Sequence, residues 1–232
     1  MTKQSGLVYV GMDVGYGELK AEALIRRCRY QVSFPATLGK GRKISYGATE
    51  LSARYPGQQL TDEDGLWFVG NLARSQLIDG EQQILRGRTV DEAIFATPFR
   101  RRLFRSAMAQ LLAAAGVSGP VRVAVVSGLP VDHLDDAEYL RAAFSGPHHL
   151  VTDVLETDVD VVEVVVVPQP FGGVCSVTLT ERGEVNLAHV AKRTGMCDVG
   201  TYTVETETPG SQAQLFEADV LRRQAKMMSR KW

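Results

Sequence analysis

The feature that most constrains the fold is a pair of short apolar runs separated by three residues near the N-terminus. Residues 7–14 read LVYVGMDV and residues 18–25 read ELKAEALI, with the tripeptide Gly-Tyr-Gly at 15–17 between them. The second run taken alone is equally compatible with a helix, but a glycine-rich turn directly after a buried strand favours a hairpin. We therefore expect the chain to begin with two antiparallel strands, followed by a third strand at residues 30–34.

Composition limits the classes of protein to which the chain can belong. The 232 residues are 44% hydrophobic and 23% charged, with a net charge of −1, so the bulk charge favours neither nucleic acid nor a membrane as partner. The chain shows neither a signal peptide nor a transmembrane segment, which would need roughly 18–20 apolar residues. Three distant cysteines, Cys28, Cys175 and Cys197, indicate free thiols in a reducing compartment. These features predict a cytoplasmic protein.

A polar segment and a long helix follow the first strands. Residues 36–90 are rich in Gly, Arg, Ser, Asp and Gln around one apolar patch, and we interpret them as a small inserted subdomain. A helix is predicted over residues 96–116, with Pro98 in its first turn and Gly116 at its end. Four arginines of this helix are expected on a solvent-exposed face rather than in a nucleic-acid patch: Arg100, Arg101, Arg102 and Arg105.

The second half of the chain predicts a sheet of mixed direction. Helices are expected at residues 135–144 and from the Pro-Gln-Pro sequence to about residue 182. Hairpin-linked first strands favour a mixed sheet flanked by helices over a Rossmann domain, and neither GxGxxG nor GxxxxGK[ST] occurs. Strands are expected at residues 121–131, 148–156, 159–167, 188–199 and 201–207.

The first hairpin has the chemistry of a phosphate-binding turn. Its glycines allow backbone N–H groups to approach an anion, Lys20 can meet a phosphate as a point charge, and Asp13 can hold Mg²⁺ through water. A plain hairpin in which Asp13 caps the turn is the alternative. The sequence DVGTYTVE at residues 198–205 repeats the design, which favours two loops that clamp a polyphosphate.

These two motifs resemble those of a known superfamily. Asp-Val-Gly-Tyr-Gly-x-x-Lys, beginning at Asp13, resembles the phosphate-1 motif of actin, heat-shock chaperones and sugar kinases, and Asp-Val-Gly-Thr-Tyr-Thr resembles the phosphate-2 motif. The segments at residues 127–131 and 166–173 resemble those of bacterial and archaeal ParM-like actins of plasmid segregation. The resemblance implies an α/β, ribonuclease H-like actin-type domain with a mixed sheet, flanking helices and the inserted subdomain.

The resemblance also implies roles for individual residues. Asp13 and Asp198 would position Mg²⁺, and Asp198 would also face the attacking water, which Gln169 would orient. Phosphoryl transfer needs mainly positioning and charge stabilisation, so a neutral amide is sufficient for that task. The implied contacts to the phosphates of ATP or GTP come from Gly15, Tyr16, Gly17 and Lys20 on one side, and from Gly200, Thr201, Tyr202 and the supporting Thr203 on the other.

The resemblance ends soon after the second motif. The sequence predicts an N-terminal lobe at 1–167 and, at 168–232, a linking helix with only the start of a second lobe and a basic tail. The leading hypothesis is an actin-like ATPase that couples nucleotide hydrolysis to filament assembly, with self-association and a DNA-segregation adaptor as implied contacts. Alternatives are a non-catalytic module that binds or caps filaments of a full-length relative, and a sugar or acetate kinase relative.

Overall fold

The computed structural model describes residues 6–44, 46–84, 90–180, 184–185, 196–199 and 204–207. The chain divides into two compact units, Met1–Val167 and Pro168–Trp232. Within the described residues, no helix combines the length and the apolar character that crossing a membrane requires.

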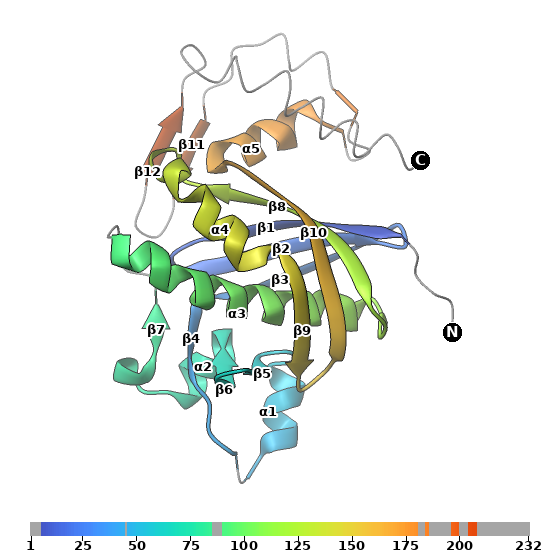
Figure 1. The fold of residues 1–232 in the computed structure, drawn as a ribbon, viewed down its shortest axis with the longest axis vertical. Coiled ribbons are helices and arrows are strands. Elements are labelled where there is room, and N and C mark those ends of the chain that lie inside the picture. The colour runs from blue at the N-terminus through green and yellow to red at the C-terminus, as the bar shows by residue number, and fades with distance from the viewer. Residues whose placement is uncertain are drawn as a thin grey trace. The chain divides into compact units, whose positions relative to one another are not determined.

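The first unit is a mixed α/β structure built on one sheet (Figure 1). Across the described sheet the ten strands lie in the order β3-β2-β1-β8-β10-β9-β5-β6-β4-β7. The strands are β1 (Leu7–Val14), β2 (Glu18–Ile25), β3 (Cys28–Pro35), β4 (Thr37–Lys40), β5 (Gln59–Asp62), β6 (Gly65–Val69), β7 (Gln83–Ile84), β8 (Val121–Leu129), β9 (Gly146–Thr152) and β10 (Glu156–Pro168). The helices are α1 (Ala48–Arg54), α2 (Gly70–Gln76), α3 (Val90–Ala114) and α4 (Ala137–Phe144), with 3₁₀ turns η1 (Asp79–Glu81) and η2 (Val131–Asp136).

The first three strands form an antiparallel meander, and the prediction of the opening hairpin is confirmed. β1 pairs with β2 from Tyr9–Leu24 to Val14–Leu19, and its other edge pairs with β8 in parallel. The third strand begins two residues earlier than the expected residue 30, because Arg26 and Arg27 make the preceding turn with φ values of 51° and 67°. Arginine rarely adopts this left-handed conformation. The sequence has no glycine or asparagine at these two positions to indicate the turn, which is why the prediction placed the strand later.

The polar segment 36–90 extends the main sheet. Its strand β5 pairs with β9, which joins the strands β4 to β7 to the strands that surround β1. Asp153, in the turn after β9, strengthens this junction by accepting hydrogen bonds from Gly57 N at 3.0 Å and from the hydroxyl of Ser52. The segment is therefore attached through backbone pairing as well as through side chains.

Helix α3 is longer than the sequence predicts. It begins at Val90, so Pro98 lies inside the helix and the expectation that it occupies the first turn is wrong. A proline inside a helix removes one backbone hydrogen bond, and the packing around α3 must offset that cost. The predicted end is confirmed: Gly116 has φ of 63°, and Val117 N donates to Leu112 O at 2.9 Å. These are the features of a glycine-terminated helix.

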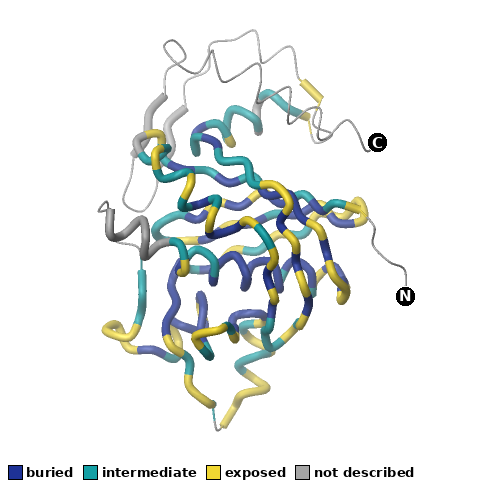
Figure 2. The backbone as a smooth tube through the Cα atoms, in the orientation of Figure 1, coloured by how far each residue is buried: buried dark blue, intermediate teal, exposed yellow. Residues whose placement is uncertain are grey.

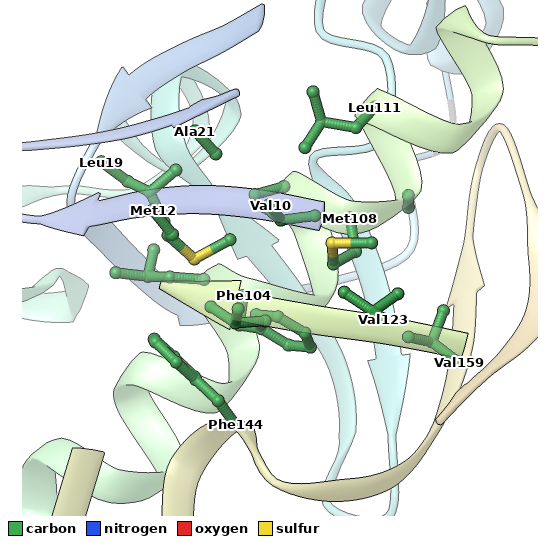
Figure 3. Packing of buried hydrophobic residues seen from close by; sticks show 14 of the residues in the cluster. Val10, Met12, Leu19, Ala21, Phe104, Met108, Leu111, Val123, Phe144 and Val159 are labelled. Carbon is green, nitrogen blue, oxygen red and sulfur yellow. The ribbon is translucent and has the colours of Figure 1, made fainter. Parts of the chain in front are cut away.

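The centre of α3 is buried on all sides. Every residue from 102 to 109 is buried, and Figure 2 shows this part of α3 in dark blue. Phe104 and Met108 pack with residues of β1 and β8 such as Val10 and Val123, and the Phe104 ring stacks on Phe144 of α4 at 5.0 Å between centroids (Figure 3). The helix thus forms the core that the sheet, α4 and the 36–90 segment share.

The prediction that the arginines of α3 face solvent is wrong for Arg102 and Arg105, while Arg100 and Arg101 are partly exposed. Arg102 and Arg105 are only 7% and 9% exposed, because the acidic β5–β6 turn covers them. Arg102 Nε lies 2.6 Å from Asp62 Oδ2, and Arg105 Nη1 lies 3.0 Å from Glu63 Oε2. The Arg102 guanidinium also lies 3.7 Å from the centroid of the Trp67 ring, whose Nε1 donates to Asp62 at 2.9 Å. Opposite charges on two segments distant in the sequence therefore form one partly buried network.

Removing Asp62 takes away the partner of the buried Arg102 Nε, while Asp64 still accepts from Arg102 Nη2. We expect Asp62→Ala to lower the free energy of unfolding by about 3 kcal/mol, measured by urea denaturation. The matched control is Glu138→Ala, which removes the exposed partner of Arg141. That change is expected to cost less than about 1 kcal/mol. Equal losses in the two variants would contradict a stabilising role for the buried network.

His148, near the start of β9, is a buried histidine. It is 2% exposed, its Nε2 donates to Phe144 O at 2.7 Å, and its ring lies 4.9 Å from that of Phe104. Burial lowers the pKa of His148 to about 4, opposed by the hydrogen bond to Phe144 and reinforced by Arg105. The imidazole is therefore neutral in the folded protein at neutral pH.

This difference in pKa predicts a specific loss of stability in acid. The unfolded chain binds a proton on His148 near pH 6.5, whereas the folded chain binds it only near pH 4. The free energy of unfolding should therefore fall between pH 6.5 and 4, by up to about 3 kcal/mol from this group. In urea unfolding across this range, His148→Gln should flatten the profile. A wild-type slope in the His148 variant would refute the assignment.

The second unit contains α5 (Gln169–Thr178) and the antiparallel pair β11 (Met196–Val199) and β12 (Val204–Glu207). The helix begins where the sequence predicts, and it ends at Thr178 rather than near residue 182. The basic tail at residues 220–232 lies outside the described residues.

Candidate functional site

The turn between β1 and β2 is narrow. Gly15 N donates to Glu18 O at 3.0 Å, which leaves only Tyr16 and Gly17 at the tip. A Cβ at Gly15 would lie 3.1 Å from the Glu18 carbonyl oxygen, so the close approach of backbone explains this glycine. Gly15 is not among the residues of positive φ, so the turn does not need this glycine for a left-handed conformation. Gly17 O accepts from Ala36 N at 3.1 Å, which holds the turn from its other side.

Asp13 and Lys20 face each other across the hairpin. They are paired in the register of β1 and β2, and both are exposed, so their side chains project from the same face of the sheet. Lys20 Nζ lies 3.6 Å from Glu18 Oε2, and the Ser33 hydroxyl donates to the same carboxylate group. The structure therefore brings together a carboxylate and an amine that the sequence predicted, beside a turn of exposed backbone.

Glu18 is the member of this group that sequence reasoning missed. Its side chain is 49% exposed and shares the solvent face with Lys20, as residues two apart on a strand do. The alternation of residues along β2 was the available signal. Glu18 competes with any anion for the ammonium group of Lys20, so binding of a phosphate near Lys20 requires that this exposed ion pair open. Such exposed pairs are weak.

Tyr16 differs from its neighbours in direction. Its side chain packs against the main hydrophobic core, whereas Asp13 and Lys20 lie on the open face. The tip of the turn is thus covered on its inner side by an aromatic ring and open on its outer side. A ligand at the tip of the turn would therefore contact backbone groups, Asp13 and Lys20 on the open face, and the side chain of Tyr16 on the face toward the core.

The other predicted site residues belong to the second unit. Gln169 is the first residue of α5, directly after Pro168, and Asp198 is the third residue of β11, paired in register with Glu205. Side-chain positions of Asp198 are not described. The predicted loop residues lie outside the described residues: Gly200, Thr201, Tyr202 and Thr203.

The donors at the hairpin fit a metal held jointly with phosphate. Among the described residues, no group of three or more His, Cys, Asp or Glu side chains is placed to hold a metal ion. Mg²⁺ is usually held by one or two carboxylates together with phosphate oxygens and water. A single exposed carboxylate at Asp13, opposite an amine, fits that arrangement and does not fit an all-protein metal cage.

The described cysteines do not add a nucleophile to this site. Cys28 is an exposed free thiol, and Cys175 is a partly buried one. Burial raises the pKa of the Cys175 thiol to about 11, which disfavours the reactive thiolate at neutral pH.

Comparison with known proteins identifies one family and several similar folds. Residues 11–172 match the family described as the N-terminal domain of actin-like proteins. The crystal structure of the apo ParM protein of psk41 is similar, with a TM-score of 0.64 at 13% identity, over 97% of this chain and 77% of that chain. No curated protein sequence matches this chain significantly.

Three further structures have comparable folds. ParM of Bacillus thuringiensis in its apo form gives a TM-score of 0.63 at 15% identity, over 94% of this chain and 66% of that chain. A hybrid protein of the same ParM with ADP gives a TM-score of 0.63 at 15% identity, over 93% of this chain and 30% of that chain. The archaeal actin homologue Ta0583 gives a TM-score of 0.56 at 18% identity, over 86% of this chain and 56% of that chain. At these identities the similarity shows the fold alone, and the chain spans about two thirds of the Bacillus thuringiensis ParM.

Proposed function

Since the chain belongs to the actin-like proteins, we propose that it binds a magnesium-bound nucleoside triphosphate, ATP or GTP, and hydrolyses it. The observation that carries the proposal is the Asp13–Lys20 pair beside the Gly15 turn, within residues that match the actin-like N-terminal domain. The ADP in the hybrid ParM of similar fold supports a nucleotide as the ligand. Coupling of hydrolysis to filament assembly in the cytoplasm, as in segregation of plasmid DNA, is part of the proposal.

The proposal assigns the chain a ribonuclease H-like actin domain. The order β3-β2-β1-β8-β10, with an antiparallel meander followed by parallel β8, supports that assignment. In this reading residues 1–167 are the N-terminal lobe, with residues 36–90 inserted in it. Residues 168–232 hold the linking helix and the beginning of a second lobe.

Each residue has a chemical task in this proposal. Asp13 holds Mg²⁺ through water, and Lys20 neutralises the charge of the phosphates near the turn. Gln169 orients the attacking water, Asp198 faces the metal from the second unit, and both tasks need positioning more than covalent chemistry. Backbone N–H groups at Tyr16 and Gly17, and at Gly200, Thr201, Tyr202 and Thr203, complete the phosphate contacts.

Nucleotide binding tests the hairpin directly. A charge-assisted contact contributes enough binding free energy that Lys20→Gln should weaken binding of Mg·ATP by about 10- to 100-fold in calorimetric titration. Lys43→Gln is the matched control, because it removes the same charge at an exposed position away from the hairpin. Equal affinities in all three proteins would refute the role of Lys20.

Hydrolysis tests the residues of the second unit. We expect Gln169→Ala and Asp198→Ala each to lower the rate of phosphate release by about 100-fold or more while the affinity for Mg·ATP changes little, because they act on the reaction step. Gln31→Ala, at an exposed position of β3, should leave the rate unchanged. Wild-type turnover in both variants would exclude this assignment. ATP-dependent light scattering by the wild-type protein would test filament assembly separately.

A further inference from the structure

The turn between β2 and β3 consists of two arginines in a backbone conformation that is unfavourable for arginine. Ile25 and Cys28 are paired in register, so Arg26 and Arg27 alone make the turn. Their φ values are 51° and 67°. A two-residue hairpin turn with two positive φ values is usually made by Asn-Gly or a similar pair, because a long side chain strains the left-handed conformation. The turn therefore holds backbone strain, and such strain is concentrated at functional positions.

Two further arginines lie at the same end of the sheet. Arg29 pairs in register with Leu24, which in turn pairs with Tyr9 of β1. Arg122 of β8 pairs with Leu7, two residues before Tyr9. The register thus places residues of β1, β2, β3 and β8 side by side at this end. All four arginines are exposed, and together they form the basic turn patch: Arg26, Arg27, Arg29 and Arg122.

Three members of the basic turn patch contribute most of its charge. Glu22 Oε1 lies 2.9 Å from Arg29 Nε, so Arg29 is partly neutralised. Arg26, Arg27 and Arg122 each add a positive charge at this end of the sheet. The net charge of −1 is an average over the whole chain and conceals this local concentration.

The basic turn patch is separate from the candidate nucleotide site. Lys20 pairs with Asp13 beside the Gly15 turn, at the opposite end of β2 from Arg26. At about 3.4 Å per residue along a strand, roughly 20 Å separate Lys20 from Arg26. An inference about the patch therefore does not rest on the proposed function.

We propose that the basic turn patch binds the phosphate backbone of double-stranded DNA, independently of base sequence. Arginine presents a planar set of donors that matches phosphate oxygens, and contacts of this kind carry no sequence information. Exposure of the arginines favours this partner over an acidic peptide, because a single exposed ion pair with a carboxylate contributes little. A duplex carries about one charge per 1.7 Å and releases condensed counterions on contact, so a few exposed cations suffice for measurable binding.

The strained backbone gives this proposal a second consequence. Asn-Gly at the turn would relieve the strain but would also remove two cations from the basic turn patch. A residue retained for function at the expense of stability is expected to show opposite effects on the two properties when it is replaced. Replacement of Arg26 and Arg27 should therefore stabilise the protein and weaken its binding to DNA.

The first measurement is binding of the full chain to a fluorescein-labelled DNA duplex of about 20 base pairs, by fluorescence anisotropy without nucleotide. With three phosphate contacts, the wild-type affinity should fall about 40-fold between about 50 and 200 mM salt. Arg26→Asn/Arg27→Gly leaves one of the three contacts, so its affinity should be lower by about tenfold or more at low salt. Its own affinity should fall only about fourfold over the same range of salt.

Two other double variants separate charge from backbone strain. Arg26→Gln/Arg27→Gln removes the charges without the favourable turn residues, so it should lose binding to the same extent. Arg26→Lys/Arg27→Lys retains the charges and should keep the wild-type salt dependence. The matched control is Lys43→Gln/Arg54→Gln, which removes two exposed charges from the 36–90 segment and should bind the duplex as the wild type does.

The second measurement is thermal unfolding without DNA. Arg26→Asn/Arg27→Gly should raise the Tm by about 3–6 °C, because asparagine and glycine adopt positive φ with less strain. Arg26→Gln/Arg27→Gln should leave the Tm close to that of the wild type. A lower Tm for Arg26→Asn/Arg27→Gly would show that the two arginines stabilise the turn, and would overturn the argument from strain.

The binding results decide between partners. Equal duplex binding by the wild type and both neutral variants would overturn the proposal, and so would an equal loss in the Lys43→Gln/Arg54→Gln control. The same proteins are titrated with phosphatidylglycerol vesicles and with polyglutamate. Binding to either of these that depends on Arg26 and Arg27, without binding to the duplex, would assign the patch to a membrane or to an acidic protein and overturn DNA as the partner. Unchanged affinity of Arg26→Asn/Arg27→Gly for Mg·ATP is the expected result for a patch distinct from the nucleotide site.

Discussion

Arg102 and Arg105 bind the acidic turn between β5 and β6, and this charge pairing is what allows α3 to be buried on all sides. The side of α3 toward the sheet is apolar and packs on β1 and β8. The opposite side carries cations, which could not be buried without the carboxylates of Asp62 and Glu63. The same ion pairs attach the 36–90 segment to α3, because its acidic turn carries Asp62 and Glu63. The strands of the segment also continue the main sheet.

Burial of α3 in turn positions the candidate site. The helix supports the β1–β2 hairpin from below, so the turn at Gly15 is held against the core by Tyr16 while Asp13 and Lys20 remain exposed. A rigid hairpin with charged groups on one face is the kind of preorganised site that phosphate chemistry requires.

Local patterns predicted several elements accurately. Residues 7–14 and 18–25 have strand bounds that match the prediction, because alternation and a glycine-rich turn are properties of adjacent residues. The structure adds that Asp13 pairs with Lys20, since the length of the turn determines the register of a hairpin. The start of α3 was placed wrongly because Pro98 suggests a first turn, whereas tertiary packing offsets a proline inside the helix.

The sequence by itself determined the hairpin, the chemistry at its turn and the presence of a long helix carrying four arginines. Only the tertiary structure decided which of those arginines are paired, because their partners lie about 40 residues away along the chain, in the turn that begins at Asp62. It also decided that β5 joins β9. Turn geometry and periodicity depend on neighbouring residues, whereas neutralisation of a buried charge depends on contacts that no local pattern contains.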